Sequence, residues 1–228
     1  MNKAVIFIVE GATDRRALEK IFKKIYRHKE IHFEFTHGDI TSDQNINTSN
    51  VESEIYKFVD IYRKDKKLKP RDIWQIVQIF DTDGTYVDDS VIVKGDSKEI
   101  VYSTENIFCK SVEKVKERNK HKREMMNYLL NCDNIKGIPY KCYYLSSNLD
   151  HALYNQLNLD DEMKRQYSQA FYEQFIGKEL LFIDFLEMEV VNGVPTSFPS
   201  SWRYIQEDLH SLERHTNLHI YFKENPIL

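Results

Sequence analysis

The chain has 228 residues, of which 41% are hydrophobic and 30% charged, enough for one sizeable core or for one domain with a smaller appendage. Only 7 glycines and 5 prolines argue against disorder, and a net charge of −4 gives no overall attraction for phosphate. The 3 cysteines follow no disulfide or zinc spacing, and the opening apolar run, residues 4–9, is too short for a membrane span, so we expect a cytoplasmic protein outside the membrane.

The chain opens with a strand, a tight turn and a helix. Residues 4–9 are an unbroken β-branched and aromatic run, typical of a central strand with both faces buried in a parallel sheet. Residues 11–13 predict a turn and a helix N-cap, and apolar residues at helical spacing continue to Tyr26. This order is the expected start of an α/β fold.

A second strand and a second helix are predicted next. Residues 31–35 alternate between apolar and polar, as in a second strand of the layer or an edge strand. Ser49 and Glu52 form a capping-box pattern, and a helix is expected from there to Tyr62. A basic stretch at 64–71 follows, which is either a solvated loop or a nucleic-acid contact.

The middle of the chain carries two further strands. Residues 73–80, Ile-Trp-Gln-Ile-Val-Gln-Ile-Phe, predict a strand that leads straight into acidic residues. Apolar residues in 107–130 predict one helix or two, and the charged run 114–124 within them is interpreted as a solvated face. Residues 141–145 predict another strand, followed by a polar segment and a helix. Three predicted strands therefore end in polar residues.

The rest of the chain is expected to be mainly helical. Helical spacing covers residues 160–186, and after a loop at 195–201 the apolar residues of 202–212 fit one helix face. Residues 218–222 alternate as a short final strand. The fold class is therefore α/β, with a mostly parallel sheet flanked by helices and a mainly helical C-terminal part.

Acidic residues stand at two of the predicted strand ends. Glu10 follows the first strand, and Asp81 and Asp83 follow the strand at 73–80. In open α/β sheets, ligands bind outside the carboxyl ends of the strands, where the loops converge. Carboxylates placed together repel unless a cation lies among them, and Mg²⁺ is suited to one or two carboxylates with waters and a substrate phosphate. We therefore expect these acids to share a magnesium ion.

Two motifs together resemble those of Toprim domains. Residues 9–14, Val-Glu-Gly-Ala-Thr-Asp, are similar to the glutamate motif of that family, and residues 80–84, Phe-Asp-Thr-Asp-Gly, to its paired-aspartate motif. Toprim domains occur in topoisomerases, bacterial primases, small RNA-maturation nucleases and OLD-type nucleases, several of which act in phage defence. The resemblance covers residues 3–150, and it favours a Toprim-like catalytic domain at 1–150 with a helical extension at 151–228 packed on it.

The resemblance implies a metal-dependent nuclease that cleaves phosphodiester bonds in DNA or RNA. Asp81 and Asp83 would hold Mg²⁺ or Mn²⁺, and Glu10 either completes the metal site or handles a proton. In the OLD-like branch an acid four positions after the glutamate also belongs to the metal site, which corresponds to Asp14. The other interpretation of Asp14 is a carboxylate that favours the helix N-terminus. Nucleic acid is the implied partner, with a homo-oligomer or a partner ATPase as further expectations.

Polar residues after the strand at 141–145 are further candidates. Ser147 and Asn148 either face the site or cap the following helix, and His151 either acts on phosphate or a proton or is structural. This segment is similar to a Ser/Asn-rich motif of small bacterial Toprim proteins of the RloB type. Residues 214–217 either contact phosphate or an interface, or end a solvated helix.

The same residues also resemble a second family. Residues 80–85 match the nucleophile motif of haloacid-dehalogenase-like phosphatases, in which Asp81 would attack phosphorus and Asp83 would act as general acid, with 144–148 as the second motif. That family usually carries this motif on its first strand, so the nuclease is favoured. A third interpretation is a non-catalytic Toprim-like module for binding or assembly. Topoisomerase action is not expected, because no motif marks any of the 14 tyrosines.

Overall fold

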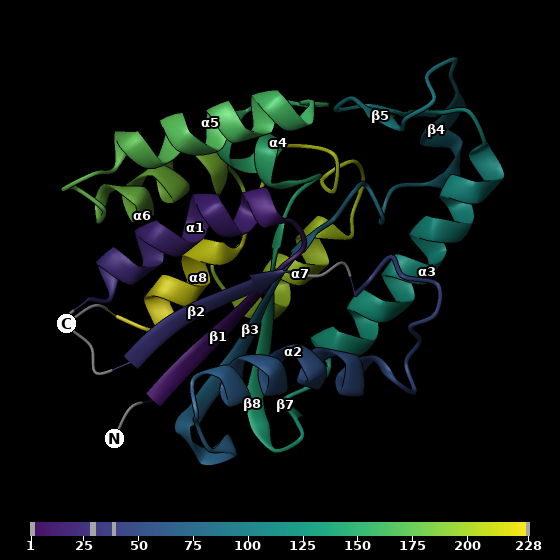
Figure 1. Cartoon of the computed structure of the whole chain (residues 1–228). Coiled ribbons are helices and arrows are strands. Elements are labelled where there is room, and N and C mark those ends of the chain that lie inside the picture. The colour runs from purple at the N-terminus through teal and green to yellow at the C-terminus, as the bar shows by residue number, and fades with distance from the viewer. Residues whose placement is uncertain (1–2, 28–30, 38–39, 227–228) are drawn as a thin grey trace. The chain divides into compact units, whose positions relative to one another are not determined.

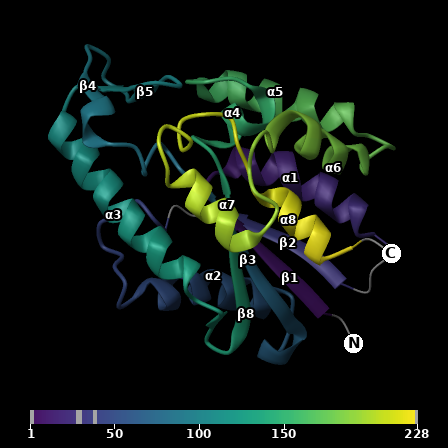
Figure 2. The same ribbon diagram turned by 180° about the vertical axis from the view of Figure 1, so that it is seen from behind.

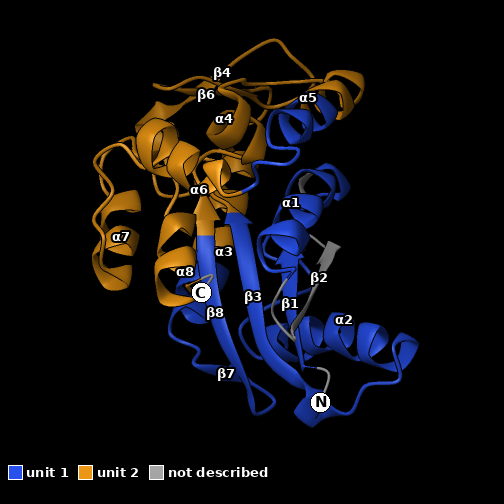
Figure 3. Ribbon diagram, turned by 90° about the vertical axis from the view of Figure 1, so that its left-hand side faces the viewer, with its two compact units in different colours: residues 1–80, 124–143, 168–179 blue, residues 81–123, 144–167, 180–228 orange. Residues whose placement is uncertain are grey.

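The computed structural model describes residues 3–27, 31–37 and 40–226 and has a mixed α/β fold (Figure 1). The chain divides into two compact units (Figure 3). Unit 1 comprises residues 1–80, 124–143 and 168–179. Unit 2 comprises residues 81–123, 144–167 and 180–228. The two units alternate along the chain. The division into a catalytic domain at 1–150 and an extension at 151–228, expected from the sequence, stays a prediction.

Unit 1 is built on a sheet of five strands in the order β2-β1-β3-β8-β7. The strands are β1 (Lys3–Val9), β2 (Ile31–His37), β3 (Ile73–Asp81), β7 (Asn134–Ile135) and β8 (Ile138–Leu145). β1 pairs in parallel with both of its neighbours, whereas β7 and β8 are antiparallel. The predicted strands at 4–9, 31–35, 73–80 and 141–145 are all confirmed, and β2 is an edge strand.

The first strand, β1, lies between two other strands and is buried on both faces. Every residue from Ala4 to Val9 is buried, so both faces of β1 are covered, as the unbroken apolar run predicted. The helix α1 (Ala12–Ile25) supplies part of this cover, since the Phe22 ring lies edge-on to Phe7 with 4.9 Å between centroids. The second helix of the unit is α2 (Val51–Asp65), with Ile55 fully buried.

Both helix starts predicted for this unit are wrong in detail. Helix α1 begins at Ala12, so the turn predicted at 11–13 is already helical from its second residue. Helix α2 has Asn50 as its N-cap, without a capping side-chain hydrogen bond. The expected capping box does not form, because the Ser49 hydroxyl and backbone N–H both donate to the Asn47 side chain, and Glu52 accepts a hydrogen bond from Tyr128.

Unit 2 contains a second, three-stranded sheet with the order β4-β6-β5. Its strands are β4 (Ile92–Lys94), β5 (Val101–Tyr102) and β6 (Ile107–Cys109). The helical prediction for residues 107–130 is therefore wrong at its start, and a single helix, α3 (Val112–Leu130), covers the rest. A buried apolar cluster joins this sheet to the helix and to a distant turn through Val87, Ile92, Ile107, Cys109, Val115 and Leu212.

The later helices are short. They are α4 (Leu149–Tyr154), α5 (Asp161–Gln174), α6 (Leu181–Phe185), a π-helical stretch (Leu186–Val190), α7 (Phe198–Ile205) and α8 (Leu218–Glu224). Helix α7 starts inside the predicted loop 195–201, with Ser197 as its N-cap. The asparagine before α8, Asn217, donates to Ser201 of α7, and these two helices lie side by side (Figure 2).

Two predictions near the C-terminus are wrong. The helix expected over 202–212 ends at Ile205, and Leu212 reaches the apolar cluster from a turn. The strand expected at 218–222 is the first part of helix α8. All five residues from 218 to 222 are buried, so the polar positions of the alternation do not mark an exposed face. The hydroxyl of Thr216 accepts a hydrogen bond from the Leu218 backbone and starts this helix.

Within the described ranges, no helix has both the length and the apolar composition needed to cross a bilayer.

Gly84 provides a test of the packing in unit 2. Its φ is +64°, and a Cβ at this position would lie 2.6 Å from Leu212 and 2.8 Å from Ile107. We expect Gly84→Ala to lower the free energy of unfolding by about 2 kcal/mol or more, since strain and overpacking add. Gly137→Ala is the matched control, because Gly137 also has a positive φ, +82°, but nothing within 4 Å. Equal losses in chemical denaturation of the two variants would contradict the crowding.

Candidate active site

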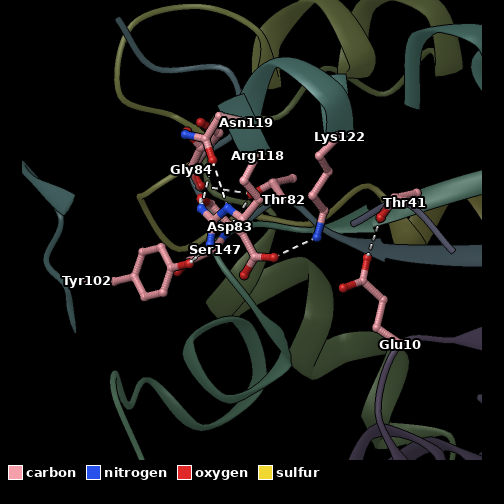
Figure 4. A network of polar contacts seen from close by, with 11 residues as sticks. Glu10, Thr41, Thr82, Asp83, Gly84, Tyr102, Arg118, Asn119, Lys122 and Ser147 are labelled. Carbon is pink, nitrogen blue, oxygen red and sulfur yellow. Dashed lines mark hydrogen bonds and ion pairs between the residues drawn. The ribbon is translucent and has the colours of Figure 1, made fainter. Parts of the chain in front are cut away.

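The acidic segment after β3 is held in place by backbone hydrogen bonds within unit 2 (Figure 4). The Thr82 N–H donates to the Leu145 carbonyl at 3.0 Å, and the Asp83 N–H donates to the Ser147 carbonyl at 2.7 Å. The Gly84 N–H and the Thr82 hydroxyl both donate to the Ser211 carbonyl, at 3.2 and 2.8 Å. Two segments that are distant in the sequence therefore fix the backbone that carries the paired aspartates.

Two residues of this arrangement have a left-handed backbone without being glycine. Asp83 has a φ of +49° and Ser147 a φ of +56°. A non-glycine residue in this region costs free energy and persists where the surroundings hold it. Here the Ser147 N–H donates to the Thr82 hydroxyl at 2.8 Å and to the Ser211 carbonyl at 3.0 Å. The strain lies where the two polar segments meet, as is common at functional sites.

A buried lysine neutralises the second aspartate. Lys122 of α3 has no exposed side-chain surface, and its ammonium lies 2.6 Å from Oδ2 of Asp83, whose side chain is 21% exposed. Burial alone would raise the pKa of the Asp83 carboxyl, but the charges of Lys122 and Arg118 outweigh it and hold this pKa below its ordinary value. Asp83 is therefore an ionised carboxylate in the folded protein at neutral pH.

The same face of α3 also binds the backbone of the acidic loop. Arg118 donates to the Asp83 carbonyl at 3.2 Å and to the Tyr102 hydroxyl at 2.7 Å. Asn119, which is buried, donates to the Gly84 carbonyl at 3.3 Å. Residues one helical turn apart thus hold both the carboxylate and the carbonyls of this loop.

The solvated face expected at 114–124 is wrong for this part of α3. Val115, Asn119 and Lys122 are all buried, and their spacing of four and three places them on one side of the helix. That spacing was visible in the sequence, but a lysine and an asparagine on a buried face look like solvent-exposed residues until their partners are known. The aspartate and the carbonyls of the loop are those partners.

A polar pocket of about 260 Å³ lies in the same unit. Its lining includes Tyr102, Asn148, Asp150, Asn158 and Lys164. The Lys164 ammonium lies 3.6 Å from the buried carboxylate of Asp150. Burial and the charge of Asp83 raise the pKa of Tyr102 to about 12, so the phenol that lines the pocket stays protonated near the acidic loop. The pocket therefore offers a mixture of cationic, anionic and amide groups.

The polar segment after β8 caps a helix. Asn148 is the N-cap of α4 and accepts a hydrogen bond from the His151 N–H at 3.0 Å, which confirms the capping interpretation for Asn148. Burial, followed by the charges of Arg214 and His215, lowers the pKa of His151 to about 4. The imidazole is therefore neutral at pH 7, and a role of His151 in catalysis would be that of a neutral side chain.

The remaining sequence candidates are the acids at two strand ends and at the start of a helix. Glu10, in unit 1, directly follows β1, is half-buried and accepts a hydrogen bond from the Thr41 hydroxyl at 3.2 Å. Asp81 is the last residue of β3 and is also half-buried. Asp14 belongs to the first turn of α1, and its side chain lies outside what the structure describes. In the described part of the chain, no group of three or more His, Cys, Asp or Glu side chains is placed to hold a metal ion.

Residues 214–217 serve the fold of unit 2. Arg214 donates to the Ala152 carbonyl at 3.0 Å, and the Asn217 side chain accepts from the Tyr144 N–H at 2.9 Å. Thr216 donates to the Tyr144 carbonyl at 2.7 Å. These bonds tie the turn before α8 to the end of β8 and to α4.

No family model, curated protein or solved structure matches the chain. The chemistry of the site is therefore argued from its own residues. These are an ionised aspartate paired with a buried lysine, an arginine bound to the same loop, and an adjoining strand-end aspartate.

The ion pair predicts a measurable loss of stability. Asp83→Asn removes the carboxylate charge that lies 2.6 Å from the buried Lys122 ammonium. We expect a loss of about 2 kcal/mol, below the roughly 3–5 kcal/mol of fully buried pairs because Asp83 is partly exposed. Asp89→Asn is the control, since that side chain is 56% exposed and lies 3.9 Å from Lys116, and it should cost less than about 0.5 kcal/mol. Urea unfolding at pH 7 measures both.

The same pair predicts a pH dependence. A carboxyl whose pKa is lowered by folding contributes stability above its unfolded pKa, about 3.9, and loses it as the pH falls through the folded value. The stability difference between the wild type and Asp83→Asn should therefore be full at neutral pH and shrink below about pH 4. A difference that grows on acidification would contradict the lowered pKa of Asp83.

Proposed function

We propose that this chain is a metal-dependent nuclease that cleaves phosphodiester bonds in DNA or RNA. The observation that supports the proposal best is the acidic loop after β3, where Asp83 is kept ionised beside Asp81 and its backbone is fixed by hydrogen bonds. An acidic loop with a fixed backbone and neighbouring cations is typical of a site that binds metal and phosphate, and less typical of an ordinary solvent-exposed turn.

The donor chemistry of this loop fits Mg²⁺ or Mn²⁺. Both ions prefer oxygen ligands, and Mg²⁺ is commonly held by only one or two carboxylates together with water and substrate phosphate. Lys122 contacts Oδ2, which is one of the two carboxylate oxygens of Asp83. Such an ion, when bound by Asp81 and Asp83, would polarise the scissile phosphate and lower the pKa of a water.

The protein groups then have separate tasks. Asp81 and Asp83 hold the cation, while Lys122 and Arg118 supply positive charge beside the loop, where a phosphate gains charge during cleavage. Glu10 is the third acid of the proposal, either as a metal ligand or as the group that accepts a proton. The resemblance to OLD-like Toprim nucleases also keeps Asp14 as a metal-site candidate.

The strand arrangement supports a Toprim-like sheet as part of the proposal. β1, which precedes Glu10, and β3, which ends in Asp81, are neighbours in one sheet and run in parallel. Carboxyl ends of parallel strands are where α/β enzymes place their chemistry. Two sequence motifs separated by about seventy positions in the chain thus follow adjacent strands.

One observation also favours the phosphatase as a second candidate. The two segments that resemble phosphatase motifs are hydrogen-bonded to each other, Thr82 to Leu145 and Asp83 to Ser147. Asp81 would then be the nucleophile and Asp83 the general acid. The salt bridge with Lys122 disfavours this assignment, because a general acid must be protonated and the lysine stabilises the ionised form of Asp83.

Cleavage assays with matched variants test the proposal. Incubation with Mg²⁺ or Mn²⁺ should lead to cutting of plasmid DNA or of a structured RNA, and EDTA should stop it. Asp81→Asn and Glu10→Gln should each lower the rate at least about a hundredfold, with little change in thermal midpoint. Asp89→Asn, which changes an exposed acid outside the loop, should cut at the wild-type rate.

The same series separates the alternatives. Hydrolysis of a phosphate monoester without any nuclease activity, lost in Asp81→Asn, would replace the nuclease by the phosphatase. Inactivity of the wild-type protein on DNA, RNA and monoester would favour a non-catalytic module. Full cleavage by Glu10→Gln would remove Glu10 from the proposed site.

A further inference from the structure

An exposed tryptophan lies at the start of β3, in unit 1. The chain has two tryptophans, and they differ sharply: Trp74 is 50% exposed, whereas Trp202 is 1% exposed. The ammonium of Lys3, on the neighbouring strand β1, lies 4.7 Å from the centroid of the Trp74 ring. This indole is half exposed with a cation over its ring, and tryptophan is enriched where proteins bind partners.

The segment that leads into this tryptophan is strongly basic. Residues 64–72 contain five cations and two acids, a net charge of +3 in a chain whose total is −4. The five cations are all exposed. Lys64 pairs with Asp60 at 2.6 Å and Lys66 with Asp65 at 3.0 Å. In the described ranges no carboxylate forms an ion pair with the remaining three, Lys67, Lys69 and Arg71.

This basic turn has a defined structure. Leu68 N–H donates to the Arg63 carbonyl at 2.8 Å, and the Arg63 guanidinium donates to the Leu68 carbonyl at 3.2 Å, so the turn is closed against the end of α2. The Asp72 carboxylate accepts from the Lys69 N–H at 2.7 Å. The cations are therefore presented on an ordered backbone immediately before Trp74, which reduces the entropy lost when a ligand binds.

We infer that Trp74, Lys3 and the turn of residues 64–72 form a binding surface for single-stranded nucleic acid. A base stacks on an exposed aromatic ring, and the phosphates on either side of that base need nearby cations. A half-exposed ring with Lys3 over it, and with Lys67, Lys69 and Arg71 on the preceding turn, offers both an aromatic surface and cations. Duplex DNA offers no unstacked base to the ring, so the single strand is the better match.

This inference goes beyond the proposed cleavage. Binding at the surface uses neither Asp81 nor Asp83 and needs no metal ion. The surface would hold a strand by its backbone and one or more bases without reading sequence, because every base has a face that stacks. A failure of the nuclease proposal therefore leaves this surface untouched, and the two can be tested separately.

The tryptophan itself reports the binding. Titration of the full chain with an oligothymidine in EDTA should quench Trp74 emission, and the quenching should disappear in Trp74→Phe, whose remaining emission comes from the buried Trp202. Trp74→Ala should weaken binding of a fluorescently labelled oligonucleotide by about tenfold in anisotropy. Replacing Lys69 and Arg71 together by alanine should reduce the slope of log K against log salt by about 1.4, roughly 0.7 for each lost phosphate contact.

Matched controls make the result decisive. Lys24→Ala, which removes an exposed cation on α1, should bind the oligonucleotide with wild-type affinity and salt slope. Unchanged affinity in Trp74→Ala, equal affinity for a duplex of the same sequence, or tighter binding to vesicles of anionic lipid than to the oligonucleotide would each overturn the inference.

Discussion

The pairing of Lys122 with Asp83 is the interaction on which the candidate site depends. A lysine with no exposed side-chain surface is costly to bury unless its charge is compensated, and the carboxylate of Asp83 lies 2.6 Å away. The same helix face binds the Asp83 and Gly84 carbonyls through Arg118 and Asn119. Breaking the pair would therefore disturb both the charge and the backbone of the loop, and the strained φ of Asp83 would lose a support.

This charge balance gives the loop a property that a plain acidic turn lacks. Asp83 stays ionised, and positive charge from Lys122 and Arg118 is fixed next to it before any substrate arrives. Preorganised charges of this kind are what phosphate chemistry requires, because they need no rearrangement when the transition state forms. The lysine would also lower the affinity for a metal ion, since its ammonium and the ion would share the carboxylate of Asp83. A cation at Asp83 must therefore bind in the presence of a permanent positive neighbour.

The sequence predicted the parts of the fold that depend on local patterns. The strand β1 is an unbroken apolar run from Ala4 to Val9, β3 is rich in β-branched residues, and the acids at the ends of these strands were identified from their position. The site could be predicted only in part. Lys122 is recognised as a site residue only through its contact with Asp83, which lies 39 positions earlier in the chain. Helix α8 was mistaken for a strand since all of residues 218–222 are buried, and alternation is informative only when one face meets water. Tertiary contacts, which the local sequence pattern does not contain, determine the role of Lys122 and the conformation of residues 218–222.

Metal uptake at the paired aspartates is the central claim, and calorimetry tests it most directly. Titration of Mn²⁺ into the wild-type protein should show saturable binding that is lost in a variant with both Asp81 and Asp83 changed to asparagine, and retained in Asp89→Asn. That result would place the cation at the loop held by Lys122. Absence of any Mn²⁺ or Mg²⁺ uptake by the wild-type protein, or equal uptake by the double variant, would contradict the account.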